Sequence, residues 1–191
     1  HECSSAASDV YKRQVIDDAD DNLRYLRSSG IEGVADDLQW LSDWTEQFAR
    51  KHTMLISQRH SNGFIRECHG DLHLQNVIDW KGRFVPFDGI EFNDRFRWID
   101  VLSDAAFLAM DFAARDRTDL GNAFINAYLE KTGDYASLPM LRWYLTFRSL
   151  VRAKVAAIRA VELGDANSGH RRAIADCIAH IKLARRFTNP S

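Results

Sequence analysis

Three oxygen-bearing side chains, Asp71, Asn76 and Asp88, could together serve phosphoryl transfer. Asp71 and Asn76 share one loop, residues 69–76, which reads HGDLHLQN. Asp88 follows in residues 87–92, FDGIEF, after a segment whose pattern predicts a β-hairpin that brings the chain back. A carboxylate and an amide oxygen are ligands that a hard Mg²⁺ ion accepts while it also holds nucleotide phosphates. Asn76 and Asp88 are therefore candidate magnesium ligands, and Asp71 is left to orient a substrate hydroxyl and accept its proton.

The order of these residues resembles the catalytic segment of kinases, in which H-R-D-x-x-x-x-N is followed by a metal-binding Asp-Phe-Gly. His69, Gly70 and Asp71 occupy the first three positions here. This His-Gly-Asp form is typical of the aminoglycoside phosphotransferase and choline kinase family, and the chain resembles an uncharacterised bacterial branch of it. The resemblance implies that Asp71 is the catalytic base and that Asn76 and Asp88 hold magnesium.

The next helical segment begins with two acids that have a counterpart in the same family. Residues 100–106, DVLSDAA, resemble the family's segment in which an acid at a helix start braces the backbone of the catalytic loop. Asp104 matches that position best, and Asp100 is the second candidate. We expect His69 to be structural, with its ring holding the loop by packing and hydrogen bonds.

The resemblance implies an ATP-dependent phosphotransferase that moves a phosphoryl group to a hydroxyl of a small molecule, with Mg²⁺ as cofactor and ATP as co-substrate. It does not choose the acceptor, because related enzymes use aminoglycosides, choline, sugars and other alcohols. Gly70 stands where an arginine would bind an activation-loop phosphate, so regulation of the protein-kinase type is not expected. Residues 147–154, FRSLVRAK, resemble a branch in which a P-loop kinase domain can follow downstream.

The half of the ATP site that such a kinase builds on its N-terminal lobe has no counterpart in the sequence. That lobe needs a glycine-rich strand-turn-strand and a lysine on a following strand. The residues before His69 have helical patterns instead, and their one close glycine pair, Gly30 and Gly33, has no β pattern on either side. We therefore expect residues 15–191 to form a C-terminal catalytic lobe that is inactive alone.

The elements that must position these residues are mostly helices. Residues 17–60 carry apolar side chains at helical steps, with a break near Gly30. A small β island follows, with a strand at residues 64–68 and the hairpin at residues 77–87. Helical spacing then returns at residues 98–114, 120–131, 138–163 and 171–187. This segregation predicts an α+β fold, mainly α-helical, here the C-terminal lobe of a protein-kinase-like fold with a small catalytic hairpin.

The composition argues against several classes of function. The chain has 191 residues, of which 46% are hydrophobic and 27% charged, and its net charge of -2 argues against nucleic-acid binding. No uninterrupted apolar run approaches the roughly 18 residues of a membrane span. The three cysteines form no CxxC pair. These features favour a cytoplasmic protein with neither a nucleic-acid nor a membrane partner.

The first residues are expected to lie outside the fold. The stretch CSSAASDVYKRQ at residues 3–14 resembles translated adapter sequence, and the first methionine is Met54. We therefore expect that the natural start is missing and that residues 1–14 are a non-native or disordered tail.

Two other classes of function remain open. The alternation of His69, Asp71 and His73 can ligate a transition metal, as in a metal-dependent phosphoesterase. Further ligands are not evident downstream, because His170 and His180 stand alone. His73 could instead touch a phosphate or the substrate, although an ordinary hydrogen-bonded loop histidine is favoured. The third alternative is a non-catalytic binding or regulatory remnant, and the missing N-terminal lobe is the main feature of the sequence that supports it.

Two groups of charged residues have two interpretations each. Arg148, Arg152 and Arg159 lie near one helical face and could attract an anionic substrate, although we favour a solvated surface. The sequence leaves their role undecided. Three acids could form a pocket for a cationic aminoglycoside or be ordinary helix-end charges: Asp111, Asp116 and Asp119.

Overall fold

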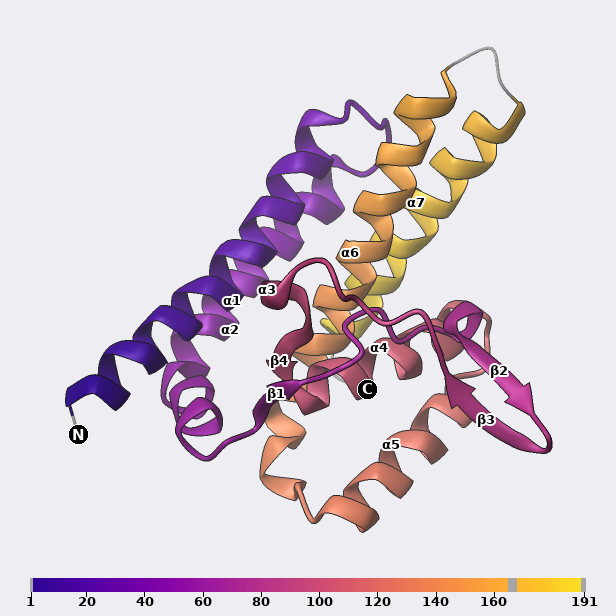
Figure 1. The fold of residues 1–191 in the computed structure, drawn as a ribbon. Helices are drawn as coiled ribbons and strands as arrows, with labels where there is room; N and C mark the ends of the chain where they lie inside the picture. The colour runs from indigo at the N-terminus through magenta and orange to yellow at the C-terminus, as the bar shows by residue number, and fades with distance from the viewer. Residues whose placement is uncertain (1, 165–167, 190–191) are drawn as a thin grey trace.

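The chain begins with two long helices that pack side by side. The computed structural model describes residues 2–164 and 168–189. Helix α1 spans Glu2–Ser28 and helix α2 spans Ala35–Ser61 (Figure 1). Gly30 has a φ of 70° in the connection between them, a backbone conformation that favours glycine. The break predicted at this position is therefore confirmed.

Helix α1 begins earlier than the sequence predicted. Tyr11 is buried in an apolar cluster that also includes Ala19, with Val15 packed against it. These three residues are four apart, so one face of the helix continues unbroken toward its N-terminus. Residues 2–14 belong to α1, so the disordered alternative for residues 1–14 is wrong where the structure describes them, whereas the alternative of a non-native tail stays a prediction. His1 lies outside the described residues.

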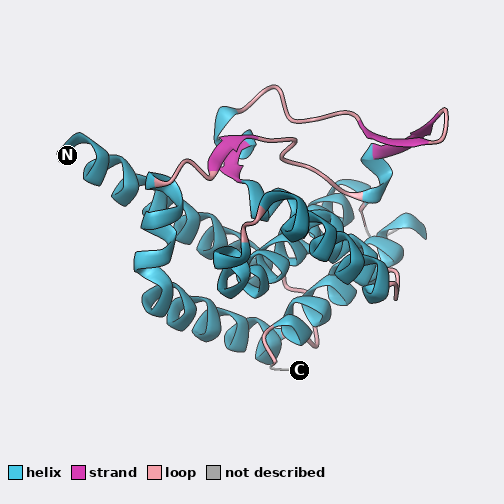
Figure 2. Cartoon of the chain, turned by 90° about the horizontal axis from the view of Figure 1, so that it is seen from below, coloured by secondary structure: helices cyan, strands magenta, loops and turns pink. Residues whose placement is uncertain are grey.

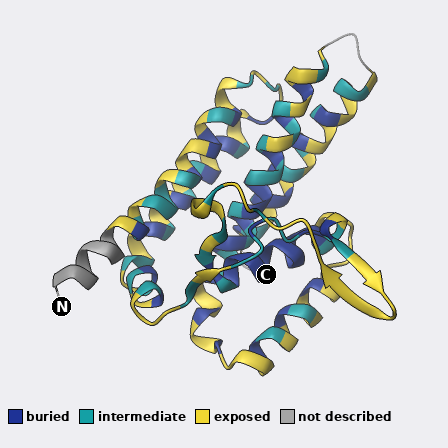
Figure 3. Ribbon diagram, viewed as in Figure 1, coloured by how far each residue is buried: buried dark blue, intermediate teal, exposed yellow. Residues whose placement is uncertain are grey.

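The predicted hairpin is confirmed. Strand β2 (Val77–Trp80) pairs antiparallel with β3 (Arg83–Pro86), and both strands are largely exposed (Figures 2 and 3). Lys81 and Gly82 both have positive φ, as a two-residue type I′ turn requires. The Asp79 carboxylate accepts a 2.8 Å hydrogen bond from the backbone N–H of Gly82.

A second antiparallel pair was only half predicted. Strand β1 (Ile65–Glu67) falls within the predicted strand, but its partner β4 (Trp98–Asp100) falls within residues 98–114, which were predicted to be helical. The backbone groups of β1 need partners, and β4 supplies them in the register Ile65 opposite Asp100. The N–H of Cys68 extends the ladder with a bond to the carbonyl of Arg97.

The remaining helices form the body of the molecule, and the α+β, mainly helical class is confirmed. The described elements that complete it are η1 (Leu74–Asn76), α3 (Asp94–Arg97), α4 (Val101–Ala114), α5 (Thr118–Thr132), η2 (Tyr135–Ser137), α6 (Leu138–Leu163) and α7 (Ser168–Phe187). Helix α4 contacts both α5 and α6 and is buried along most of its length. Among the described residues, no helix combines the length and apolar character needed to cross a membrane.

A buried ion network ties α2 to the start of α4. The guanidinium of Arg59 forms ion pairs with Asp100 and with Asp134, and all three side chains are almost fully buried. Tyr144 also donates a 2.9 Å hydrogen bond to Asp100. Asp100 caps α4 by accepting a bond from the N–H of Leu102. This network fixes the start of α4, the helix that also carries Ser103 and Asp104.

Candidate functional site

The Asp104 carboxylate binds the backbone of the loop at residues 69–76. One carboxylate oxygen accepts a 3.0 Å hydrogen bond from the N–H of His69, and the other accepts a 3.0 Å bond from the N–H of Gly70. Asp104 is buried in the first turn of α4. The contact with the loop is thus made by Asp104, the first candidate, whereas Asp100 is engaged by Arg59 and the helix cap.

Arg148 holds the same loop from a second helix. Its Nη1 donates a 3.1 Å hydrogen bond to the carbonyl of Gly70, and its Nε lies 3.2 Å from both the carbonyl and the hydroxyl oxygens of Ser103. The guanidinium also lies 4.9 Å from the centre of the Phe107 ring. Arg148 is buried, so the favoured interpretation of a solvated surface is wrong for this residue. Helical spacing could have indicated the burial of Arg148, because it lies four residues after Tyr144 and therefore on the same face of α6, which is buried.

Gly70 cannot be replaced by a larger residue without a clash. Its φ is +82°, and a Cβ atom added there would lie 2.6 Å from the carbonyl oxygen of Phe96. Both the backbone conformation and the close approach therefore require glycine at this position. An arginine between His69 and Asp71 would therefore force the loop or the Phe96 backbone of this structure to move.

His69 joins the loop to the segment that follows the hairpin. Its Nδ1 accepts a bond from the N–H of Asp71, and its Nε2 lies 2.8 Å from the carbonyl oxygen of Phe87. The two contacts together fit the tautomer with the proton on Nε2. The N–H of Ile90 also donates a 2.9 Å bond to the carbonyl of His69. The contacts of His69 are thus structural, and both its ring nitrogens are engaged.

The Asp71 carboxylate lies at the surface of the loop, and neighbouring side chains bind one of its two oxygens. Its side chain is 38% exposed, so it remains accessible to a ligand. Its Oδ2 lies 3.2 Å from Nε2 of His73 and accepts a 3.3 Å bond from the amide of Asn76. The same amide donates a 3.0 Å bond to the Asp71 carbonyl. The structure therefore brings Asp71, His73 and Asn76 together.

Opposing effects act on the charge of Asp71. Partial burial raises its pKa, but the hydrogen bond from His73 and the positive charges of Arg152 and Arg148 outweigh that effect. The net result is a pKa below the ordinary value, so the group is a carboxylate at neutral pH. His73 is buried, packs edge-on against Phe107, and leaves its Nδ1 without a hydrogen-bond partner among the described residues.

Asn76 and Asp88 retain oxygens that could bind a cation. Both amide hydrogen bonds of Asn76 go through its nitrogen to Asp71, so its Oδ1 has no protein donor among the described residues. Asp88 is exposed, and within the described chain its carboxylate forms no hydrogen bond or ion pair. The backbone links the two residues, because the N–H of Phe87 donates a 2.9 Å bond to the carbonyl of Asn76. An amide and a carboxylate oxygen fit Mg²⁺ by chemical type.

Asp88 has a backbone conformation that few residues adopt. Its φ of 60° lies in the left-handed region, which aspartate tolerates at some cost in free energy. Such conformations are concentrated at functional sites.

The described residues contain no group of three or more His, Cys, Asp or Glu side chains arranged to hold a metal. The phosphoesterase alternative therefore receives no support from His69, Asp71 and His73.

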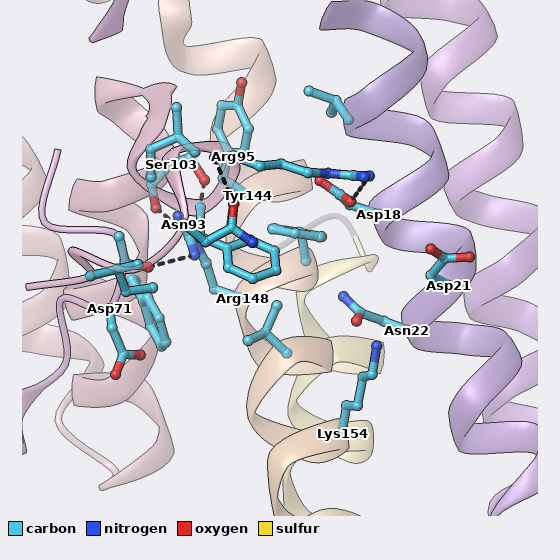
Figure 4. Close-up of a pocket in the computed structure, with 18 of the residues that line it drawn as sticks. Asp18, Asp21, Asn22, Asp71, Asn93, Arg95, Ser103, Tyr144, Arg148 and Lys154 are labelled. Carbon is cyan, nitrogen blue, oxygen red and sulfur yellow. Dashed lines mark hydrogen bonds and ion pairs between the residues drawn. The ribbon is translucent and has the colours of Figure 1, made fainter. Parts of the chain in front are cut away.

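A cavity of about 600 Å³ opens beside the loop (Figure 4). Asp71 and Gly70 line one side of it, α1 lines the opposite side, and α6 forms its floor. Most of the lining side chains are apolar, including Phe92, Phe107 and Phe147. The volume is within the range of small-molecule sites. Sequence analysis missed this cavity, because only tertiary packing places α1 opposite the loop.

The remaining charged candidates lie apart from this cavity. Arg152 is half-buried, with its Nε unpaired among the described residues, and Arg159 is exposed. Asp111 is buried and accepts a 2.9 Å bond from the N–H of Leu74. Asp119 pairs with Arg117 at the start of α5. Asp116 is exposed between α4 and α5, so the three acids do not form a common pocket with the loop.

Comparison with known proteins finds relatives but no described function. The chain is 32% identical over 165 residues to proteins named only as uncharacterized, from Mycobacterium bovis and from two strains of Mycobacterium tuberculosis. The alignment covers 86% of this chain and 32% of each relative, so the chain spans about a third of their length. No family model and no solved structure matches the chain.

Proposed function

We propose that this chain is the C-terminal catalytic lobe of a protein-kinase-like phosphotransferase of the aminoglycoside phosphotransferase type. It would transfer the γ-phosphoryl group of ATP to a hydroxyl of a small molecule. The observation that carries the proposal is the position of Asp71: an accessible carboxylate beside a cavity, on a loop whose backbone is fixed by Asp104 and Arg148. Phosphoryl transfer asks a protein mainly for such fixed positioning.

Asp71 would act on the acceptor hydroxyl. Its lowered pKa keeps it ionised at neutral pH, so it can accept a hydrogen bond from the hydroxyl and take its proton as the new P–O bond forms. His73 and Asn76 hold one of its oxygens and leave the other for the substrate. Asn76 and Asp88 would hold Mg²⁺, which neutralises charge on the nucleotide phosphates when bound.

The rest of the ATP site would come from another part of a longer protein. The hairpin and the segment after it expose large apolar side chains, among them Trp80, Phe84 and Phe92, which are 60%, 82% and 84% exposed. Exposed apolar surface of this kind commonly marks a contact with another domain. A nucleotide-binding lobe packed there would face Asp88, and that arrangement is part of the proposal.

The proposal is tested with the longer protein that contains this chain. Purified protein is incubated with MgATP and a panel of alcohols, and ³¹P NMR identifies any phosphate monoester formed. We expect a monoester with at least one acceptor, and no monoester from residues 1–191 alone. An Asp88→Ala variant is expected to lose magnesium-dependent nucleotide affinity. Formation of free phosphate from added monoesters, without ATP, would instead identify a phosphoesterase and contradict the proposal.

A further inference from the structure

The cavity beside Asp71 has a polar end that no described protein group satisfies. Asn22 lies on α1 and lines the cavity; it is only 7% exposed, and its side-chain amide forms no hydrogen bond with the described residues. Lys154 lines the cavity from α6 (Figure 4). Within the described chain its ammonium has no carboxylate partner, and its nearest aromatic contact is the Tyr25 ring at 5.6 Å. The side-chain amide of Asn22 is therefore left to hydrogen-bond with a ligand or with water in the cavity.

The acids that line the cavity are already engaged. Asp18 forms an ion pair with Arg95, and Asp21 forms a 2.8 Å ion pair with Arg24. One oxygen of Asp71 is held by His73 and Asn76, and the other is left for the acceptor hydroxyl. At the end of the cavity away from Asp71, a cationic group would therefore have to displace Arg95 or Arg24 to find a carboxylate. An anionic group would find Lys154 without a competing protein anion.

The other two cations in the cavity wall are not available in the same way, because Arg95 is paired with Asp18 and Arg148 is bound to the loop. Arg148 donates to the carbonyl of Gly70 and contacts Ser103, so its guanidinium serves the loop. Lys154 is therefore the lining cation that is left for a ligand within the described chain. Figure 4 shows Lys154 and Asn22 on the side of the cavity away from Asp71, with apolar side chains between the two ends.

We infer that the acceptor is a hydroxy acid with an apolar body. Its hydroxyl lies at Asp71, its hydrocarbon portion lies against the apolar walls, and its carboxylate accepts hydrogen bonds from Lys154 and Asn22. The Lys154 ammonium can only donate, so it favours a carboxylate over an ammonium group, and the Asn22 amide can donate to the same carboxylate through its nitrogen. The inference deepens the proposed function and rests on it for the role of the hydroxyl, but the charge preference of the cavity can be measured by binding alone.

Three matched probes separate the alternatives: 8-hydroxyoctanoate, octan-1-ol and 8-aminooctan-1-ol. They share the hydroxyl and the apolar chain and differ in the group at the other end. Each is titrated into the 191-residue chain without nucleotide, and NMR shifts of Val155 and Ile158 methyl groups, which line the cavity, report binding there. We expect 8-hydroxyoctanoate to bind about tenfold more tightly than octan-1-ol, and the amine to bind most weakly, as one charge-assisted contact predicts.

A matched pair of variants assigns the preference to Lys154. Lys154→Met keeps the aliphatic stem and should remove the advantage of the acid over the alcohol. Lys131→Met makes the same charge change on exposed α5, outside the cavity, and should leave all three affinities unchanged. Equal binding of the three probes, tighter binding of the amine, shifts outside the cavity, or an acid preference that survives Lys154→Met would each overturn the inference. If the acid preference holds but the longer protein forms no monoester with MgATP, the proposed function fails while the charge preference stands.

Discussion

Nη1 of Arg148 lies 3.1 Å from the carbonyl oxygen of Gly70, the residue before Asp71. Asp104 binds the N–H of the same glycine, so both backbone polar groups of Gly70 are fixed by charged side chains from two different helices. A loop held in this way keeps its orientation without a ligand. Preorganisation of this kind is what the proposed transfer requires, because a small displacement of the acceptor group is costly in rate.

Removing the Arg148 contact should destabilise the fold and the loop together. Arg148→Met leaves the Gly70 carbonyl and Ser103 without their buried donor, and we expect a loss of about 1–3 kcal/mol in the free energy of unfolding. Urea denaturation followed by circular dichroism measures it. The control is Arg159→Met on the exposed face of the same helix, with an expected change within about 0.5 kcal/mol. Equal effects of the two substitutions would show that the buried contacts contribute nothing.

Gly70 is expected to tolerate no side chain, and Gly82 provides the matched comparison. Both have φ near 80°, but a Cβ atom at Gly70 would meet the Phe96 carbonyl at 2.6 Å, whereas nothing lies within 4 Å at Gly82. Gly82→Ala should therefore cost only the strain of the left-handed conformation, about 1 kcal/mol. Gly70→Ala should cost at least twice as much, measured by urea denaturation. Similar costs at the two positions would mean that the loop shifts freely away from Phe96.

The ion network around Arg59 should dominate thermal stability. Arg59→Met leaves Asp100 and Asp134 buried without their cation, and loss of one partner from a buried pair costs about 3–5 kcal/mol. For a domain of this size that corresponds to a decrease in Tm of about 10 °C, measurable by calorimetry. Arg50→Met removes an exposed ion pair with Glu46 on the same helix and should change Tm by about 1–2 °C at most. A small decrease for Arg59→Met would show that the pair is readily replaced by apolar packing.

His73 should set the pH range over which Asp71 is ionised. Because His73 and the nearby arginines lower the Asp71 pKa against the effect of burial, His73→Phe should raise that pKa. A lowered folded-state pKa contributes stability at neutral pH that is lost as the pH falls through it. In the variant this loss should begin at a higher pH. A ¹³C NMR titration of the Asp71 carboxyl in both proteins measures the direction; an unchanged or lower midpoint in His73→Phe would contradict the assignment.

Local features of the structure were predictable, and most long-range ones were not. Helical spacing and the turn at Gly82 predict the helices and hairpin because each depends on residues near one another in sequence. Strand β4 was missed because its pairing with β1 joins segments more than thirty residues apart.

The residues of the candidate site also divide into those that local sequence predicted and those that it did not. Asp71 and Asn76 were predicted to act together because they share one loop, and the family resemblance of residues 100–106 pointed to Asp104. The buried role of Arg148 was missed because its partner, Gly70, is 78 residues away, and a row of arginines on an amphipathic helix usually faces water. The cavity depends on α1 packing near α6, which no local pattern specifies.

The most direct test of the account is the effect of Asp71→Asn on phosphoryl transfer by the longer protein. The substitution preserves shape but removes the proton acceptor. We expect the single-turnover rate to fall by about 10²–10⁴-fold, the range for loss of a general base. ATP affinity should stay within about twofold, because Asp71 is not among the proposed metal ligands. A variant that transfers phosphate within a fewfold of the unaltered rate would contradict the proposed role of Asp71 and, with it, the central claim.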